Sequence, residues 1–222
     1  MRYFTPGFLE FFEELAKNND KPWFEANKKR YIASVKEPFE AFIGEMIARV
    51  SADDPAVAIT PKDAIFRIYR DVRFSKDKTP YKTHVGAVIS AGGRKDMSNP
   101  GRYLQLDAEF VRIYGGLHMP DSKQLYALRQ TITNKLDEFN ALLNDKDFKE
   151  KFGMISGEQH KRVPKEFEAA ATKQPLIKNK QFYYFAKLDP KTVLDPKLPE
   201  IVMVHYFAGK KMNTFLRKAI GK

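Results

Sequence analysis

The chain has 222 residues, with 39 Lys and Arg against 28 Asp and Glu, and its formal net charge is +11. Hydrophobic residues make up 43% of it and cysteine is absent, which excludes a globally disordered chain, a disulfide framework, thiolate catalysis and a zinc finger. The excess of positive charge favours anionic partners, namely nucleic acid, phosphorylated small molecules or an acidic surface.

The first fifty residues predict a layer of helices. Thr5 and Pro6 are typical of a helix start, Asp20 is placed to cap a second helix, and Pro38 opens a third helical stretch. Glutamates interrupt the apolar N-terminal stretch, and no apolar run reaches the length of a membrane span. We therefore expect no signal peptide and no membrane partner. We also expect a cytoplasmic location, which agrees with the lack of cysteine.

The hydrophobic period changes after Pro61, where short strand-like runs alternate with turns. Asp121 is placed to cap a helix, residues 154–181 look irregular and basic, and residues 199–220 predict a closing helix with Gly209 as a candidate break. This order predicts an α+β fold in one domain, residues 1–222, with an N-terminal helical layer, a central largely antiparallel sheet and C-terminal helices. The expected strands are residues 64–74, 85–91, 102–107, 110–114 and 182–188.

The segment "FRIYRDVRFSKDKTPYKTH", residues 66–84, concentrates charge. Six basic side chains against two acidic ones leave +4, which is over a third of the net charge of the chain. If residues 65–74 form a strand, Arg70 lies at the centre of an otherwise apolar face, and Asp71 on the other face can bridge Arg67 and Arg73. A guanidinium stays charged at any working pH, so a half-buried Arg70 needs a carboxylate or a bound anion.

The same segment predicts a ligand site. Arg70, Lys78 and Lys82 can gather around a phosphate or carboxylate, because Thr79-Pro80 imposes an extended turn and arginine suits planar, bidentate recognition. His118 lies at the end of a strand just before a capped helix, where backbone amides can meet an anion. The candidate ligand-binding residues are Arg67, Arg70, Asp71, Arg73, Asp77, Lys78, Tyr81, Lys82 and His118.

Three functions stay open for this segment. The first is binding of a small anionic or phosphorylated ligand, and the second is a nucleic-acid-binding module in which lysines of residues 173–187 also contact phosphates. The third is a structural or protein-interaction domain in which the arginines and aspartates form an ion-pair lattice. Tyr183, Tyr184 and Phe185 add a candidate stacking platform, as in RNA-binding sheets, although the aromatic pattern typical of those sheets is absent.

Catalytic sequence patterns are absent from the chain. It has no P-loop, dinucleotide fingerprint or nucleophile elbow, and it lacks the glycine-rich loop and D-F-G of kinases. His84, His118, His160 and His205 are not at metal-ligand spacing, so we expect no metal and no cofactor. The sequence indicates no reaction and no oligomeric state, and whether the protein is an enzyme stays open.

The stretch "RDVRFSKDKTPYKTH", residues 70–84, closely resembles the signature of a family catalogued as domain of unknown function number twenty-four sixty-one. The stretches "FLEFFEELAKNNDKPWFEANKKRY" and "YLQLDAEFVRIYGGLHMPDSKQLYALRQTI" are similar to that family's N-terminal helices and to its strand pair, glycine turn and following helix. The resemblance covers most of the chain. It implies a cytoplasmic α+β protein and carries over no activity, cofactor or catalytic residue. The polar loop "AGGRKDMSNPGR" is where we expect this chain to depart from the family.

Overall fold

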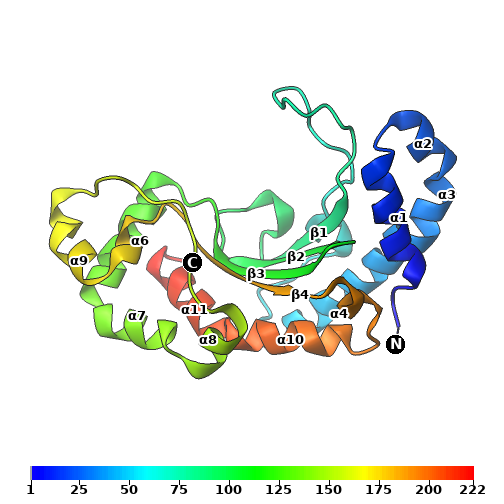
Figure 1. Ribbon diagram of the computed structural model, residues 1–222. Helices are drawn as coiled ribbons and strands as arrows, with labels where there is room; N and C mark the ends of the chain where they lie inside the picture. The colour runs from blue at the N-terminus through cyan, green and yellow to red at the C-terminus, as the bar shows by residue number, and fades with distance from the viewer. Residues whose placement is uncertain (1) are drawn as a thin grey trace.

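The computed structural model describes residues 2–222 and contains one four-stranded antiparallel sheet among these residues, in the order β1-β2-β3-β4. Helices lie at both ends of the sheet and beneath it (Figure 1). The α+β class and the antiparallel sheet are therefore confirmed. The strands are β1 (His84–Ile89), β2 (Gly101–Asp107), β3 (Val111–Leu117) and β4 (Phe182–Leu188).

The N-terminal helical layer begins as its sequence predicts. Asp20 accepts a hydrogen bond from the backbone N–H of Trp23 at 2.8 Å and so caps the second helix, whereas the side chain of Thr5 makes no capping bond. A π-helical turn, Ile32–Lys36, joins the third helix to the fourth. The helices are α1 (Pro6–Lys17), α2 (Lys21–Ala26), α3 (Lys28–Tyr31) and α4 (Glu37–Asp53).

The C-terminal half is also helical. Asp121 and Gln124 form a capping box at the start of α6, and Gly209 divides the expected closing helix in two. Residues 154–181, expected to be irregular, contain the short helix α9. The helices are α6 (Ser122–Asn134), α7 (Leu136–Leu143), α8 (Lys146–Phe152), α9 (Glu168–Lys173), α10 (Leu198–Ala208) and α11 (Lys210–Ala219).

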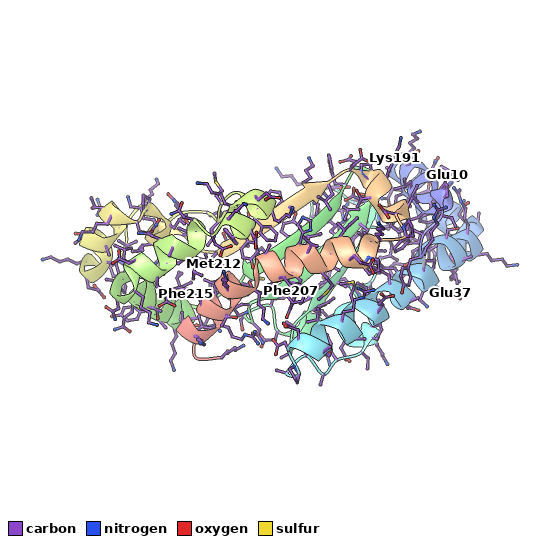
Figure 2. The ribbon with its side chains drawn as sticks, turned by 90° about the horizontal axis from the view of Figure 1, so that it is seen from below. Glu10, Glu37, Lys191, Phe207, Met212 and Phe215 are labelled. Carbon is purple, nitrogen blue, oxygen red and sulfur yellow. The ribbon has the colours of Figure 1, made fainter. Side chains whose placement is uncertain are left out.

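One face of the sheet is covered by α4, α10 and α11, as the view from below shows (Figure 2). Asn213 of α11 fixes this cover, because its Oδ1 accepts the backbone N–H of Gly116 and lies 2.8 Å from the hydroxyl of Tyr184. The buried side chains form two clusters. One joins the N-terminal helices to β1–β3 and α10, and the other joins β4 and α11 to helices α6–α9. None of the helices in residues 2–222 combines the length and apolar character that crossing a bilayer requires.

The opposite face of the sheet has no helix of residues 2–222 over its middle (Figure 1). Strand alternation and register place one set of side chains there, because directly paired residues share a face. Val88 pairs with Tyr103, Tyr103 with Tyr114, and Tyr114 with Phe185. This open face is therefore rich in aromatic side chains, while the leucines and isoleucines of the same strands point into the core.

The expected strand at residues 64–74 is wrong. Pro61–Ala64 forms the short helix α5, and the next residues touch the sheet through one isolated bridge, Ile65 to Ala87. Beyond it the chain leaves the sheet as a narrow loop, residues 68–82, which we call the signature loop. Its two arms are joined by backbone hydrogen bonds from Arg70 to Pro80 and from Lys82 to Ile68, each 2.8 Å long.

Candidate functional site

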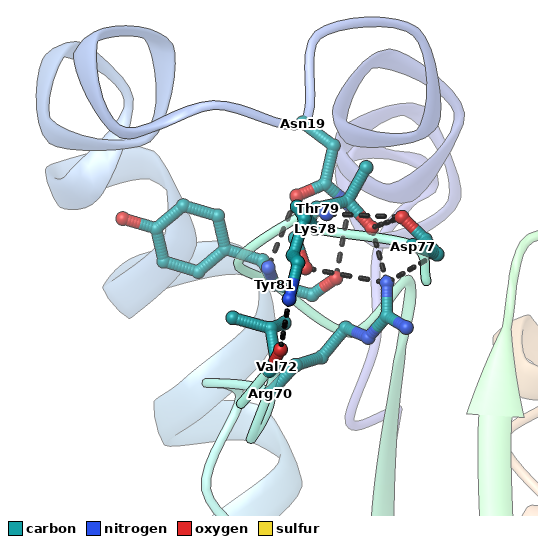
Figure 3. A network of polar contacts seen from close by, with 7 residues as sticks. All are labelled: Asn19, Arg70, Val72, Asp77, Lys78, Thr79 and Tyr81. Carbon is teal, nitrogen blue, oxygen red and sulfur yellow. Dashed lines mark hydrogen bonds and ion pairs between the residues drawn. The ribbon is translucent and has the colours of Figure 1, made fainter. Parts of the chain in front are cut away.

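The signature loop stands out from the sheet beside α1 and α2 (Figure 1) and is tied together by Arg70. The Arg70 guanidinium donates to Asp77 Oδ2 at 2.5 Å and to the carbonyl of Thr79 at 3.2 Å, and it also contacts the Thr79 hydroxyl (Figure 3). The backbone N–H of Thr79, followed by Arg70 and the Thr79 hydroxyl, lowers the pKa of Asp77 from 3.8 to about 2. The carboxylate that the half-buried Arg70 requires is therefore supplied by its own loop.

The base of the loop is held by the N-terminal helices. The Asn19 side chain donates to the Tyr81 carbonyl at 2.9 Å and accepts the Tyr81 N–H at 3.0 Å (Figure 3). The Tyr81 ring stacks on Phe24 with 3.9 Å between ring centroids and 14° between planes. Tyr81 is thus a buried anchor. The side-chain amide of Asn19 hydrogen-bonds both the N–H and the carbonyl of Tyr81, as the backbone of a neighbouring strand would.

The other charged residues of the loop do not meet around one point. Lys78 Nζ donates to the Val72 carbonyl at 3.0 Å, and Arg73 pairs with Asp71 at 2.7 Å where both are exposed. Asp71 therefore does not bridge two arginines. Next to this pair, Phe74 is 96% exposed at the tip of the loop.

A cleft of about 520 Å³ occupies the open face of the sheet, and we call it the aromatic cleft. Tyr103 of β2, Tyr114 of β3 and Tyr183 of β4 contribute rings from three neighbouring strands. The Tyr103 and Tyr114 ring centroids are 5.6 Å apart, and those of Tyr114 and Tyr183 are 6.4 Å apart. The cleft is lined by Phe66, Lys82, His84, Val88, Met97, Asn99, Gly101, Arg102, Tyr103, Tyr114, Gly115, Gly116, His118 and Tyr183.

Glycine at position 86 makes room for this arrangement. A Cβ on Gly86 would lie 2.5 Å from the hydroxyl of Tyr103, so any larger residue there displaces the ring. Gly101 and Gly116, which are paired where β2 begins and β3 ends, line the cleft without side chains of their own. The cleft is therefore shaped by missing side chains as much as by aromatic ones.

Two of the polar residues that line the cleft, Lys82 and His84, lie at its β1 edge. Lys82 Nζ donates to the Arg67 carbonyl at 3.0 Å, and burial, followed by the charge of Arg67, lowers its pKa. Burial and Lys82 together lower the pKa of His84 to about 4, against the opposing effect of Asp107. At neutral pH the imidazole of His84 is therefore uncharged.

Aromatic and basic side chains continue along the open face beyond the cleft. Phe185 stacks on Tyr114 at 5.2 Å and is 38% exposed. Lys187 lies over the Phe110 ring at 3.3 Å, and Arg112 lies over the same ring while pairing with Asp107 at 2.6 Å. The row of aromatic and basic side chains on the open face is thus longer than the cleft.

A second hollow, of about 810 Å³, adjoins the cleft at Phe66, which lines both, and we call it the basic groove. Its one lining carboxylate in residues 2–222, Glu40, lies 3.7 Å from Lys36. Arg94 donates to the carbonyl of Ile65 at 2.7 Å and so fixes the segment between the two hollows. The basic residues that line the groove are Lys36, Lys62, Arg67, Arg94 and Lys95.

The predicted site residues are thus divided among several places. Lys82 and His118 line the aromatic cleft, and the His118 ring lies 5.9 Å from that of Tyr183. Arg67 borders the basic groove. The signature loop keeps Arg70, Asp77 and Lys78 for its own bonds, holds Tyr81 at its base, and carries the pair of Asp71 and Arg73.

Sequence reasoning missed Phe66, His84, Tyr103 and Tyr114 as lining residues of one cleft. The alternation in "RYLQLD" and "VRIYGG" contained the signal, since each tyrosine falls on the face opposite the leucines and isoleucine. Among residues 2–222, no three His, Cys, Asp or Glu side chains are grouped so that they can hold a metal ion.

Comparison with known proteins gives one match. The family model described as "Conserved hypothetical protein (DUF2461)" matches residues 7–215, which include the whole sheet and the signature loop. No curated protein and no solved structure matches significantly.

Proposed function

The chain belongs to the DUF2461 family of conserved hypothetical proteins, and we propose that its open sheet face binds a planar anionic ligand of the nucleotide kind. The aromatic cleft carries this proposal. Its volume of about 520 Å³ falls within the range of small-molecule sites, about 300–1,000 Å³, and Tyr103, Tyr114 and Tyr183 are among its lining residues. Stacking on aromatic rings suits any planar base.

The anionic part of the ligand is assigned to the β1 edge of the cleft. Lys82 lies there, and it belongs both to the signature segment and to the cleft lining. His118, whose ring lies 5.9 Å from that of Tyr183 on β4, offers a second polar group. The proposal therefore keeps the anion site expected from the sequence but moves it from the loop to the sheet.

A second candidate is single-stranded nucleic acid. The observation that favours it is that the basic groove and the aromatic cleft are continuous, since Phe66 lines both. Phe185, Phe110 and Lys187 extend the same face beyond the cleft. Such a track of cations and rings is longer than one nucleotide needs, and phosphate contacts with stacked bases are the usual means of holding single strands. The net charge of +11 supports this reading.

The third candidate is a structural role for the charged cluster in an interaction domain. The bonds of Arg70 to Asp77 and Thr79 support it for that arginine, since they join the two arms of the loop. We propose no reaction, because the cleft pairs no nucleophile with a base. We propose a cytoplasmic setting, which the lack of cysteine supports.

The test is calorimetric titration of the protein with inorganic phosphate, ribose 5-phosphate, a mononucleotide and ten-residue RNA and DNA strands, at 50 and 200 mM salt. Binding of the mononucleotide but not of phosphate or the sugar phosphate is the expected result. A Tyr114→Ala variant is expected to bind roughly five- to 150-fold more weakly, because one stacking ring is worth about 1–3 kcal/mol.

Tyr126→Ala is the matched control, since Tyr126 is 45% exposed on α6, outside the cleft. Equal loss in both variants would sink the proposed site. Binding of the strands alone, with affinity that falls steeply between the two salt concentrations, would replace the first candidate by the second.

A further inference from the structure

We propose that Arg102 binds a monatomic anion, with chloride as its physiological form, in a small cavity on the covered side of the sheet. Arg102 lies on β2 and is 6% exposed. Its Nη2 donates to the Tyr206 carbonyl at 3.1 Å and its guanidinium lies 5.0 Å from the Tyr206 ring centroid. Within residues 2–222 it forms no ion pair with a carboxylate. A buried guanidinium keeps its charge, so the charge calls for compensation.

The surroundings of Arg102 give it little other help. On one side it meets an apolar gap of about 10 Å³ that is lined by Met46, Leu104, Ile113 and Val202 among others. In such surroundings an unpaired charge is far more costly than in water. The carbonyls of Tyr206 and, at 3.5 Å from Nη1, of Gly101 accept hydrogen bonds but supply only partial charges.

A cavity of about 30 Å³ lies on another side of Arg102. Three buried polar atoms without hydrogen-bond partners in residues 2–222 belong to residues that line it, namely Arg102 Nε, Ser90 Oγ and Asn99 Oδ1. About 10–15 Å³ of probe space holds one water-sized body, so this cavity suits a single small occupant rather than a polyatomic anion.

The neighbouring charges make that occupant an anion. Asp53 accepts from Lys210 at 2.6 Å and from the Tyr206 hydroxyl at 2.7 Å, and Asp54 pairs with Arg217 at 2.8 Å. Asp54, Lys210 and Arg217 line the cavity together with Arg102. The pKa of Asp53 is lowered mainly by its hydrogen bond from Lys210 and also by the charge of Arg102. Three cations therefore surround two carboxylates, which leaves one positive charge in surplus.

A water molecule would satisfy the unpartnered atoms but would leave the charge of Arg102 uncompensated. A halide accepts from Arg102 Nε and from the Ser90 hydroxyl, and it neutralises the guanidinium. Rotating the Asn99 side-chain amide by about 180° exchanges its oxygen and nitrogen. In that orientation its NH₂ group can donate to the halide. This inference does not depend on the proposed ligand of the aromatic cleft.

The direct experiment is crystallisation of the full chain in sodium bromide, with anomalous diffraction measured at the bromine edge. An anomalous peak beside Arg102 Nε and Ser90 Oγ is expected. A cavity that is empty or holds a water without anomalous signal, at bromide concentrations of several hundred millimolar, would overturn the proposal.

The solution experiment is thermal unfolding in sodium chloride and in sodium gluconate at equal ionic strength, because gluconate is too large for the cavity. We expect the melting temperature to rise with chloride to a plateau and to stay lower in gluconate, as for any ligand that binds the folded state. Arg102→Met is expected to abolish the difference, and Ser90→Ala is expected to raise the half-saturating chloride concentration.

Arg129→Met is the matched control, because Arg129 is also 6% exposed but its Nε donates to the Ile177 carbonyl at 2.9 Å. It is expected to keep the chloride effect of the unmodified chain. Equal melting temperatures of the unmodified protein in the two salts would contradict the proposal even if a variant fails to fold.

Discussion

Arg70, Arg102 and Arg129 are all withdrawn from solvent, yet each meets a different set of partners. Arg70 has a carboxylate within its own loop, Arg129 donates to the carbonyls of Ile177 and Asn179, and Arg102 has one firm acceptor and an unpartnered nitrogen. The sequence predicts that a half-buried arginine needs compensation but not which group supplies it. That choice depends on contacts between segments far apart in the chain.

The carboxyl of Asp77 reports on the bonds that close the signature loop. Its pKa of about 2 has the Thr79 backbone N–H as its largest cause and Arg70 as the second. In an Arg70→Met variant we expect its titration midpoint, followed by carbon NMR of the carboxyl, to rise part of the way toward 3.8. Arg73→Met, which removes a cation that pairs with Asp71, is expected to leave the midpoint unchanged. If the titration midpoint of Asp77 were the same in the parent and in Arg70→Met, the Arg70–Asp77 pair would not form in solution.

His84 makes the stability of the fold depend on pH. Its pKa is about 4 in the folded protein and 6.5 ordinarily, so the unfolded chain binds the proton more readily. Its effect on stability is therefore absent well above pH 6.5, and stability is lost as the pH falls from 6.5 to 4, by roughly 2–3 kcal/mol. Urea unfolding of the parent and of His84→Gln across this range is expected to show a gap that changes with pH. Parallel curves would contradict the burial of a neutral His84.

Helix ends and strand β4 are the elements that the sequence predicted best. The caps at Asp20 and Asp121 depend on a few neighbouring residues, and the run at residues 182–188 agrees with the observed strand. The prediction of a strand at residues 64–74 is wrong because a strand, unlike a helix cap, depends on residues far away in the chain. The alternation of this segment is typical of a strand, but a strand also needs a partner. Ile65 and Phe66 still contact β1, and from Ile68 onward the backbone pairs with the return arm of its own loop.

The aromatic cleft is also a property of paired elements. The alternation of each strand places its tyrosine on one face, but the register of β1, β2, β3 and β4 decides that Tyr103, Tyr114 and Tyr183 meet. The sequence predicts a platform of Tyr183, Tyr184 and Phe185 on one strand, but Tyr184 is fully buried in the core and bonded to Asn213 of α11, so it is not part of the open face. Knowledge of the strand order was needed for the other rings.

Gly86 of β1 is the element-scale test of the cleft. In a Gly86→Ala variant, the new methyl group must displace the Tyr103 ring, so we expect a loss of about 1–3 kcal/mol in unfolding free energy and weaker ligand binding. Gly44→Ala in α4 is the control, because its Cβ would meet nothing closer than 3.7 Å. Alanine is the better helix former, so this control is expected to gain about 0.5–1 kcal/mol. If Gly86→Ala changed neither the unfolding free energy nor ligand binding, the Tyr103 ring would have room to move.

At the scale of the whole molecule, helices cover one side of the sheet (Figures 1 and 2). The aromatic cleft lies on the other side. The class of the fold was predictable because helical and strand-like periods occupy separate parts of the sequence. The position of the hollows was not, because they form where the sheet, α5 and the signature loop come together. A net charge of +11 likewise predicts an anionic partner without telling where it binds.

The basic groove distinguishes the two candidate ligands. Replacing Lys62 and Lys95 by Gln removes two exposed cations from the groove and none from the cleft. If the partner is a single strand, we expect its affinity to fall and the slope of log affinity against log salt to flatten by up to about 0.7 per lost phosphate contact. Mononucleotide binding is expected to persist, and Lys123→Gln with Lys149→Gln is the control pair. An unchanged slope would remove the groove from the binding track.

The order of the strands along the chain has a kinetic consequence. Short connections, residues 90–100 and 108–110, join β1 to β2 and β2 to β3, whereas residues 118–181 separate β3 from β4. Closing that long segment costs more chain entropy, so the first three strands can associate while β4 is still undocked. Tyr183 and Phe185 arrive with β4. A newly made chain is therefore expected to complete the proposed binding face in the last step of sheet assembly, so that a partly folded chain lacks the rings of Tyr183 and Phe185.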